Sequence, residues 1–180
     1  MSKNIFLLTL ISIGWLFGQE NRGYIVNIAD PSPNFFSKID TLIKNTDPKF
    51  HNKNGKVIIL QFTASWCSVC IKEMPFIEEE IWQQHKENDN FILIALAKDT
   101  PKRPQRDKEI QFMIEKTKVT YPILTDYNSE IFELFAEKKA GVTRNIIIDQ
   151  NGDIAFLTRL FEQSEFNAMK STINQLLKKK

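Results

Sequence analysis

Apolar residues gather along the chain in continuous runs of strand length. The runs KVIILQFTA (56–64) and NFILIALA (90–97) are mostly apolar, which is typical of strands covered on both faces of a sheet. The runs NIIID (145–149) and DIAFLTRL (153–160) flank a QNG turn and predict a hairpin-like pair of strands. A further short strand is predicted for YPIL (121–124).

Between and after these runs, apolar residues recur three and four positions apart, which predicts helices. The predicted helices span residues 67–85, 107–118, 129–138 and the chain from 164 onward. Residues 24–54 show only a short strand-like run at 24–28 and are otherwise predicted to be irregular. Because strands alternate with helices before a terminal hairpin and helix, the pattern predicts one α/β domain with a mixed central sheet flanked by helices.

The first residues of the chain follow a different pattern. Within residues 1–18, a basic residue precedes the apolar run 5–17, which is too short to span a bilayer comfortably. This arrangement is typical of a secretory signal peptide cleaved after Gly18, so that residues 19–180 form the mature domain without a stable membrane span. Leu16 is larger than the residue usual three places before a cleavage site, which leaves an uncleaved membrane anchor as the alternative.

Charge and composition narrow the range of partners. The 180 residues contain 24 basic and 22 acidic side chains, a net charge of +2, so nothing favours binding to nucleic acid. A zinc or iron-sulfur site needs about four ligands. The chain has only two cysteines, with His51 and His85 as its only histidines, so neither a metal nor another cofactor is predicted.

The two cysteines, Cys67 and Cys70, are separated by two residues in the stretch SWCSVCIKEMP. A disulfide over so short a loop contributes only about 2 kcal/mol in the chain-entropy model, so a purely structural role is disfavoured. Cys67 falls where an apolar strand gives way to a helix, and the unpaired amides there favour a thiolate. We therefore predict that Cys67 attacks a partner's disulfide and that Cys70 resolves the mixed disulfide.

The stretch WCSVCIKEMP resembles the WCxxCxxExP signature of thioredoxin-like proteins of the TlpA/ResA type. GKVIILQFTASWC, YPILTD and GVTRNIIIDQNGDI are also similar to segments of that family. The resemblance implies a thioredoxin-like fold with an inserted strand-helix segment and an N-terminal extension. It implies an exported thiol-disulfide oxidoreductase in the cell envelope, in the periplasm of a Gram-negative bacterium. Its partners would be thiols and disulfides of envelope proteins and an upstream electron donor.

The resemblance assigns a role to Glu73, which occupies the acidic position three residues after Cys70. Glu73 would move protons to or from Cys70 one helical turn away, and burial would raise its pKa toward a useful range. The alternative is a surface residue beside Lys72. Gln61 stands where thioredoxin carries a buried aspartate, and an amide cannot take up a proton, so Glu73 is the better candidate.

Four further residues are candidates for substrate binding: Trp66, Val142, Thr143 and Arg144. Trp66 either offers a flat apolar contact to a partner or belongs to the core. Thr143 replaces the cis-proline of most thioredoxin-like proteins, and because a cis bond before threonine costs about 2.5–4 kcal/mol, the geometry of the Val142–Thr143 bond stays open. The Thr143 hydroxyl could hydrogen-bond a thiolate, and Arg144 either lowers the cysteine pKa or faces solvent.

Two other functions remain as alternatives. TRNIIIDQNG also resembles a segment of peroxiredoxins, which suggests a thiol peroxidase, but Thr63 lies four residues before Cys67 rather than three. The second alternative is a non-catalytic copper-handling or binding module, although the copper-delivery relatives of this fold use a wider cysteine spacing and a nearby histidine.

Overall fold

The computed structural model describes residues 22–42 and 53–178 of the chain. The predicted signal peptide, residues 1–18, lies outside the described residues, as does His51. Within the two described ranges, none of the helices is both long enough and apolar enough to cross a membrane.

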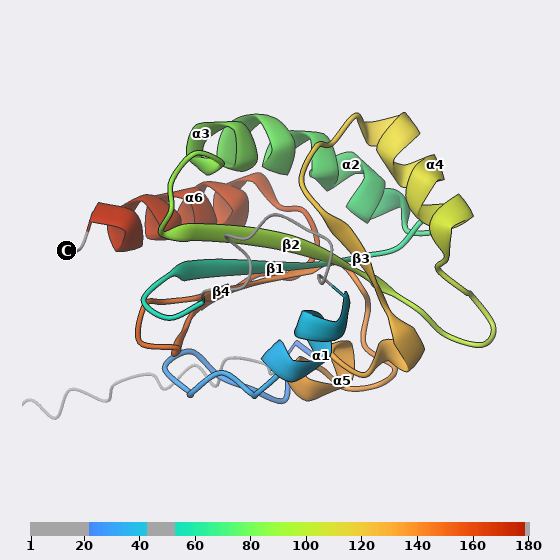
Figure 1. Ribbon diagram of the computed structural model, residues 1–180, viewed down its shortest axis with the longest axis horizontal. Coiled ribbons are helices and arrows are strands. Elements are labelled where there is room, and N and C mark those ends of the chain that lie inside the picture. The colour runs from blue at the N-terminus through green and yellow to red at the C-terminus, as the bar shows by residue number, and fades with distance from the viewer. Residues whose placement is uncertain (1–21, 43–52, 179–180) are drawn as a thin grey trace, which may run out of the picture.

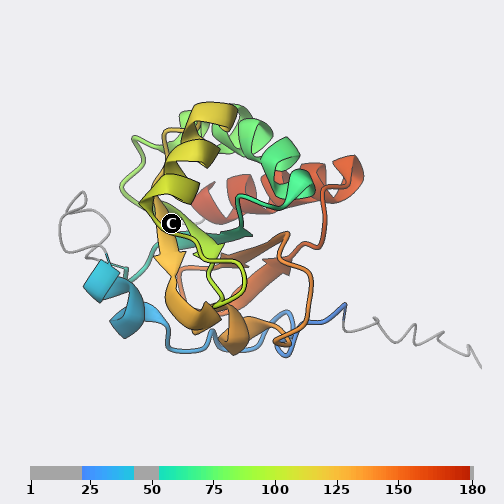
Figure 2. The same ribbon diagram turned by 90° about the vertical axis from the view of Figure 1, so that its right-hand side faces the viewer.

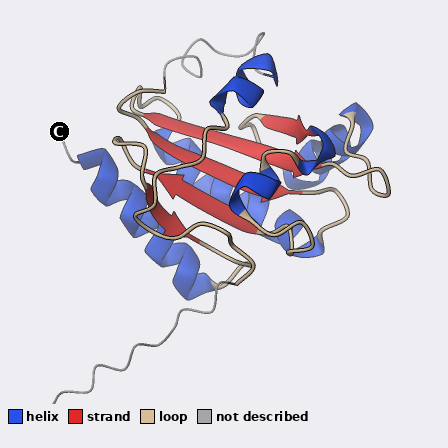
Figure 3. Cartoon of the chain, turned by 90° about the horizontal axis from the view of Figure 1, so that it is seen from below, coloured by secondary structure: helices blue, strands red, loops and turns tan. Residues whose placement is uncertain are grey.

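The centre of the fold is a mixed five-stranded sheet with the order β3-β2-β1-β4-β5 (Figure 3). Its strands are β1 (Val57–Thr63), β2 (Phe91–Lys98), β3 (Ile123–Asp126), β4 (Arg144–Ile148) and β5 (Ile154–Leu157). Strands β1, β2 and β3 are parallel, β4 is antiparallel to β1, and β5 is antiparallel to β4. Every residue of β1, β2 and β4 is buried, as their continuous apolar runs predict.

Helices cover both faces of the sheet (Figures 1 and 2). One face carries α2 (Ser68–Ile77), α3 (Gln83–His85), α4 (Asp107–Thr117) and α6 (Gln163–Lys178). The opposite face carries α1 (Phe36–Leu42) and α5 (Phe132–Phe135). A π-helical segment, η2 (Glu78–Trp82), joins α2 to α3, and a 3-10 turn, η3 (Tyr127–Ser129), precedes α5. The predicted α/β architecture with a helix-flanked mixed sheet is confirmed.

The regularly spaced apolar residues of the predicted helices face the core. Met74 and Ile77 of α2 and Ile81 of η2 are all almost fully buried. The same holds along α6, where the buried residues are Phe166, Met169, Ile173 and Leu176. These side chains fill the layer between the helices and the sheet, and a core of this kind holds the ends of the strands in fixed positions.

The structure differs from the sequence prediction in three elements. Residues 36–42 form α1, although 24–54 was predicted to be irregular; Phe35 and Ile39 anchor this helix in the core. The strand-like run at 24–28 makes only an isolated bridge, between Tyr24 and Ala136. The helix predicted for 129–138 is reduced to η3 and α5, because Asn128 and Ser129 adopt positive φ angles of 56° and 61°.

The sheet topology brings two separate parts of the chain to one edge. Strand β1 ends at Thr63, immediately before the loop that leads into α2. Because β4 is antiparallel to β1, its first residue, Arg144, lies opposite Phe62 near the end of β1. The segment before β4 therefore meets the start of α2, and this meeting point holds both cysteines.

Candidate active site

Cys67 and Cys70 lie at the start of α2 and are joined by a disulfide. Cys67 is the N-cap of the helix, with extended backbone, and its sulfur accepts the backbone N–H of Cys70 at 3.2 Å. This is the contact with an unpaired helix amide that the sequence predicts, and it favours negative charge on that sulfur. Cys67 is 9% exposed whereas Cys70 is fully buried, so a partner reaches Cys67 first.

The hydroxyl of Thr143 is placed between the two sulfurs. Its oxygen lies 3.2 Å from the sulfur of Cys67 and 3.2 Å from that of Cys70. The predicted proximity of this hydroxyl to the sulfurs is thus confirmed. The Val142–Thr143 peptide bond is trans. Val142 and Thr143 are each 4% exposed, so little of either residue reaches the surface.

Arg144 corrects the sequence interpretation, because it lies neither in solvent nor beside the sulfurs. Successive residues of extended backbone point to opposite faces, so Arg144 points away from the face that Thr143 shares with the cysteines. It is 1% exposed and donates to the carbonyls of Gly141 and Arg22 at 2.9 and 2.7 Å. Its guanidinium also covers the ring of Tyr24, 4.3 Å from the centroid. Arg144 therefore fixes the first described residues against the domain.

Glu73 lies one turn after Cys70 and is 2% exposed, so the alternative of a surface carboxylate is wrong. Its Oε1 atom accepts a hydrogen bond from the side-chain amide of Asn145 at 2.8 Å. Burial raises the pKa of Glu73 to about 7, against the lowering effect of the neighbouring amides of Asn145 and Gln61, and the charge of Glu165 raises it further. A carboxyl group with this pKa can both take and give a proton near neutral pH.

Gln61 is buried in β1 directly opposite Asn145 in β4. Its side-chain oxygen accepts a hydrogen bond from the Tyr121 hydroxyl at 2.9 Å. Asn145 and Tyr121 are site residues that the sequence analysis missed. The only signal that could have identified Asn145 is the strand register, which requires knowing how β1 and β4 pair.

Trp66 is 42% exposed beside Cys67, so the alternative of a core tryptophan is wrong. The Arg103 guanidinium lies over its ring, 4.4 Å from the centroid. The loop that carries Arg103 is tied to the cysteine loop, since the backbone N–H of Ser65 donates to the buried Gln105 side chain at 2.9 Å. An apolar ring with a cation over it is therefore held at the entrance to the disulfide, and the sequence analysis had no signal for Arg103 or Gln105.

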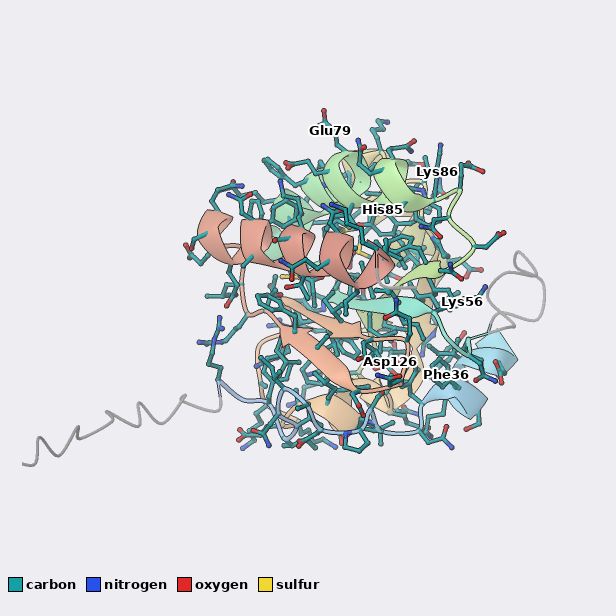
Figure 4. All side chains as sticks on the ribbon, turned by 90° about the vertical axis from the view of Figure 1, so that its left-hand side faces the viewer. Phe36, Lys56, Glu79, His85, Lys86 and Asp126 are labelled. Atoms are coloured by element: carbon teal, nitrogen blue, oxygen red, sulfur yellow. A yellow bond between two sulfur atoms is a disulfide. The ribbon has the colours of Figure 1, made fainter. Side chains whose placement is uncertain are left out.

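The residues on which the two alternative functions would depend make other contacts in the structure. The hydroxyl of Thr63, which a peroxidase would need near Cys67, is fully buried and lies 3.5 Å from the sulfur of Met74. His85 belongs to α3 in the helical layer beside α6, and its ring packs on Phe91 with 5.3 Å between centroids (Figure 4). Among the described residues, no group of three or more His, Cys, Asp or Glu side chains is arranged to hold a metal.

Residues 29–177 match the Redoxin family. The thiol-disulfide oxidoreductase ResA of Geobacillus kaustophilus is 26% identical over 158 residues, which cover 86% of this chain and 83% of that protein. ResA of Oceanobacillus iheyensis is 22% identical over 151 residues, covering 83% of this chain and 74% of the relative.

Solved structures show the same fold. A candidate protein disulfide isomerase from Bacteroides thetaiotaomicron is 39% identical with a TM-score of 0.72, over 87% of this chain and 94% of that one. A DsbE-type thiol:disulfide interchange protein from Chlorobium tepidum superposes with a TM-score of 0.63 at 18% identity, over 84% of this chain and 99% of that one. The latter supports the fold alone.

Proposed function

The chain belongs to the Redoxin family and is a thioredoxin-like thiol-disulfide oxidoreductase of the ResA/TlpA type, and from this premise we propose that it is exported and exchanges disulfides with proteins of the cell envelope. The observation that carries the proposed chemistry is the unequal placement of the two sulfurs. Cys67 caps α2 and is partly exposed, whereas Cys70 is fully buried.

In the reducing direction, the Cys67 thiolate attacks one sulfur of a partner's disulfide. A mixed disulfide forms and the partner's other sulfur leaves as a thiolate. Cys70 then gives its proton to the Glu73 carboxylate and attacks the Cys67 sulfur. The bond to the partner breaks, the partner's second thiolate leaves, and the Cys67–Cys70 disulfide remains. Two electrons thus pass to the partner, and the same steps in reverse oxidise a partner dithiol.

The partner is proposed to dock on the surface around Cys67. Trp66 supplies an exposed aromatic face, and the backbone at Val142 and Thr143 borders the sulfurs. The Thr143 hydroxyl supplies a hydrogen bond to the thiolate of the reduced protein. Arg144 does not contact a partner in this proposal, since it is buried against Tyr24. No metal or organic cofactor takes part, because the two cysteines carry the electrons themselves.

Two cysteine variants test the exchange reaction. Cys67→Ser should abolish reduction of insulin disulfides, because the attacking sulfur is removed. Cys70→Ser should instead trap mixed disulfides with partners, visible on non-reducing gels and lost on addition of dithiothreitol. If Cys67→Ser trapped the partners and Cys70→Ser did not, the order of attack and resolution would be reversed.

Export is proposed from the signal-peptide pattern of residues 1–18. The proposed location is the periplasm, with an uncleaved membrane anchor as the alternative, and the proposed partners include an upstream electron donor. Expression of the full chain in a Gram-negative host, followed by fractionation and N-terminal sequencing, tests this. A soluble periplasmic form that begins at residue 19 supports cleavage; a membrane-bound form that keeps the N-terminus supports the anchor, and a cytoplasmic form would contradict both.

A further inference from the structure

Three buried side-chain atoms beneath the cysteines have no hydrogen-bond partner among the described residues. They are Nε2 of Gln61, Oε2 of Glu73 and Oδ1 of Asn145. Gln61 and Asn145 face each other across the β1–β4 pair, and side chains opposite each other in an antiparallel pair share one face of the sheet. Glu73 packs against that face, so its carboxyl group meets two neutral amides.

The amide of Asn145 is held in one orientation. Its Nδ2 atom donates to Oε1 of Glu73 at 2.8 Å and to the Thr158 hydroxyl oxygen at 2.9 Å. The same hydroxyl oxygen accepts the backbone N–H of Asn145 at 3.0 Å, and the Thr158 N–H donates to the Asn145 carbonyl at 3.0 Å. Asn145 is fully buried and fixed by β4, so the two carboxylate oxygens of Glu73 are not equivalent: Oε1 is occupied and Oε2 is not.

We propose that Asn145 is the positioning residue for proton transfer at the active site: by holding Oε1 of Glu73, it leaves Oε2 to take up and return the proton of Cys70. The inference deepens the proposed function and rests on it. The proton balance is simple, since Cys70 loses one proton to Oε2 as it attacks Cys67 and regains it from Oε2 when the disulfide is reduced.

The surroundings of Glu73 explain why amides suit this task. The titratable groups near it are Cys70 on its own helix, Tyr121 before β3 and Glu165 on α6. Burial raises the pKa of Tyr121 well above its usual range, so it stays neutral, and Glu165 is paired with Arg22. Strands β1 and β4 contribute only amides, which stabilise the carboxylate without competing for the proton.

The test removes the amide and follows Glu73 directly. In Asn145→Leu, the carboxylate loses its donor while burial continues to favour the neutral acid, so the titration midpoint of Glu73 should rise by roughly one to two pH units. The measurement is the 13C shift of the Glu73 carboxyl carbon in the oxidised protein, assigned by its loss in Glu73→Gln. Thr117→Val removes a buried hydroxyl that bonds the Met113 carbonyl at 2.7 Å in α4, and should leave the midpoint unchanged.

A second measurement separates this inference from the proposed function. With 5,5′-dithiobis(2-nitrobenzoate), attack by Cys67 releases one thionitrobenzoate and resolution by Cys70 releases the second, so the pH profile of the second release reports the Cys70 step. In Asn145→Leu, both this profile and the carboxyl midpoint should move to higher pH together.

An unmoved carboxyl midpoint overturns the role of Asn145 and leaves the exchange reaction standing. A moved midpoint with an unmoved release profile overturns the proton transfer by Glu73, and the role of Asn145 falls with it. If Asn145→Leu does not fold, Asn145→Val removes the same amide with a donor-free side chain suited to a strand, and the same shifts are expected.

Discussion

The hydroxyl oxygen of Thr143 lies 3.2 Å from the sulfur of Cys67, close enough to hydrogen-bond that sulfur when it carries negative charge. The position follows from the antiparallel pairing of β1 and β4, which brings the residue before β4 to the start of α2. The Thr143 side chain therefore contacts the sulfur that is proposed to attack a partner's disulfide.

Replacement of this hydroxyl should slow the reactions of Cys67. Thr143→Val keeps the shape of the side chain but loses a hydrogen bond worth about 1 kcal/mol, so alkylation of the reduced protein by iodoacetamide at pH 7 should be roughly fivefold slower. Thr143→Ser keeps the hydroxyl and should react like the wild type. Equal rates for the valine and wild-type proteins would show that the hydroxyl does not stabilise the thiolate.

Loss of the exposed aromatic ring should affect protein substrates more than small ones. Trp66→Ala removes the apolar face beside Cys67, and kcat/KM for insulin should fall roughly tenfold, the effect of about 1.4 kcal/mol of contact energy. The rate with a small disulfide such as hydroxyethyl disulfide should change little. Phe112→Ala removes another exposed ring, on α4, and serves as the control. An equal fall for both disulfides would contradict a docking role.

Burial of Glu73 should make stability depend on pH. The folded-state pKa of about 7 exceeds the ordinary value of 4.5, so the folded protein binds more protons between these limits and its stability falls as pH rises through them. Through Glu73 the free energy of unfolding should fall by up to roughly 3 kcal/mol as pH rises, and Glu73→Gln should not show this fall. The measurement is urea unfolding of the oxidised proteins at pH 5 and pH 8.

The matched control is Glu79→Gln, since Glu79 points into solvent on the same helical layer (Figure 4). This variant should keep the pH dependence of the wild type. If Glu73→Gln keeps it as well, Glu73 is not the source of the effect.

Asp126 should be important for the stability of α5. Its two carboxylate oxygens accept the backbone N–H groups of Ile131 and Phe132, each at 2.8 Å, and burial raises its pKa to about 6. Asp126→Ala leaves both N–H groups unpaired and should lower the free energy of unfolding by roughly 2–3 kcal/mol in urea titrations at pH 7. Asp126→Asn retains one acceptor oxygen and should lose less; equal losses would mean that the hydrogen bonds contribute little.

Much of the fold could be predicted from the sequence, because strands buried on both faces and amphipathic helices leave simple patterns. Such patterns located β1, β2 and the apolar face of α6. The sequence analysis missed α1, because the turn-forming residues around it hide a helix whose stability comes from packing of Phe35 and Ile39 in the core rather than from its own pattern.

The candidate site could be predicted only in part. The spacing of Cys67 and Cys70 and the strand-to-helix junction are local features, so the sequence contains them. The contact between Asn145 and Glu73 joins residues 72 positions apart and depends on strand register, which no local pattern specifies. Arg144 was misinterpreted for the same reason, since its face of β4 is set by the pairing with β1.

The same pairing restricts how the chain can vary in length. Thr143 and Asn145 share one face of the extended segment and Arg144 the other, so a slip of one residue would exchange them. A guanidinium would then stand against the sulfurs and an apolar side chain against Glu73. Insertions and deletions between α5 and β4 must therefore be absorbed before the strand begins, because an extra residue passed into β4 would take Thr143 from the sulfurs and Asn145 from Glu73.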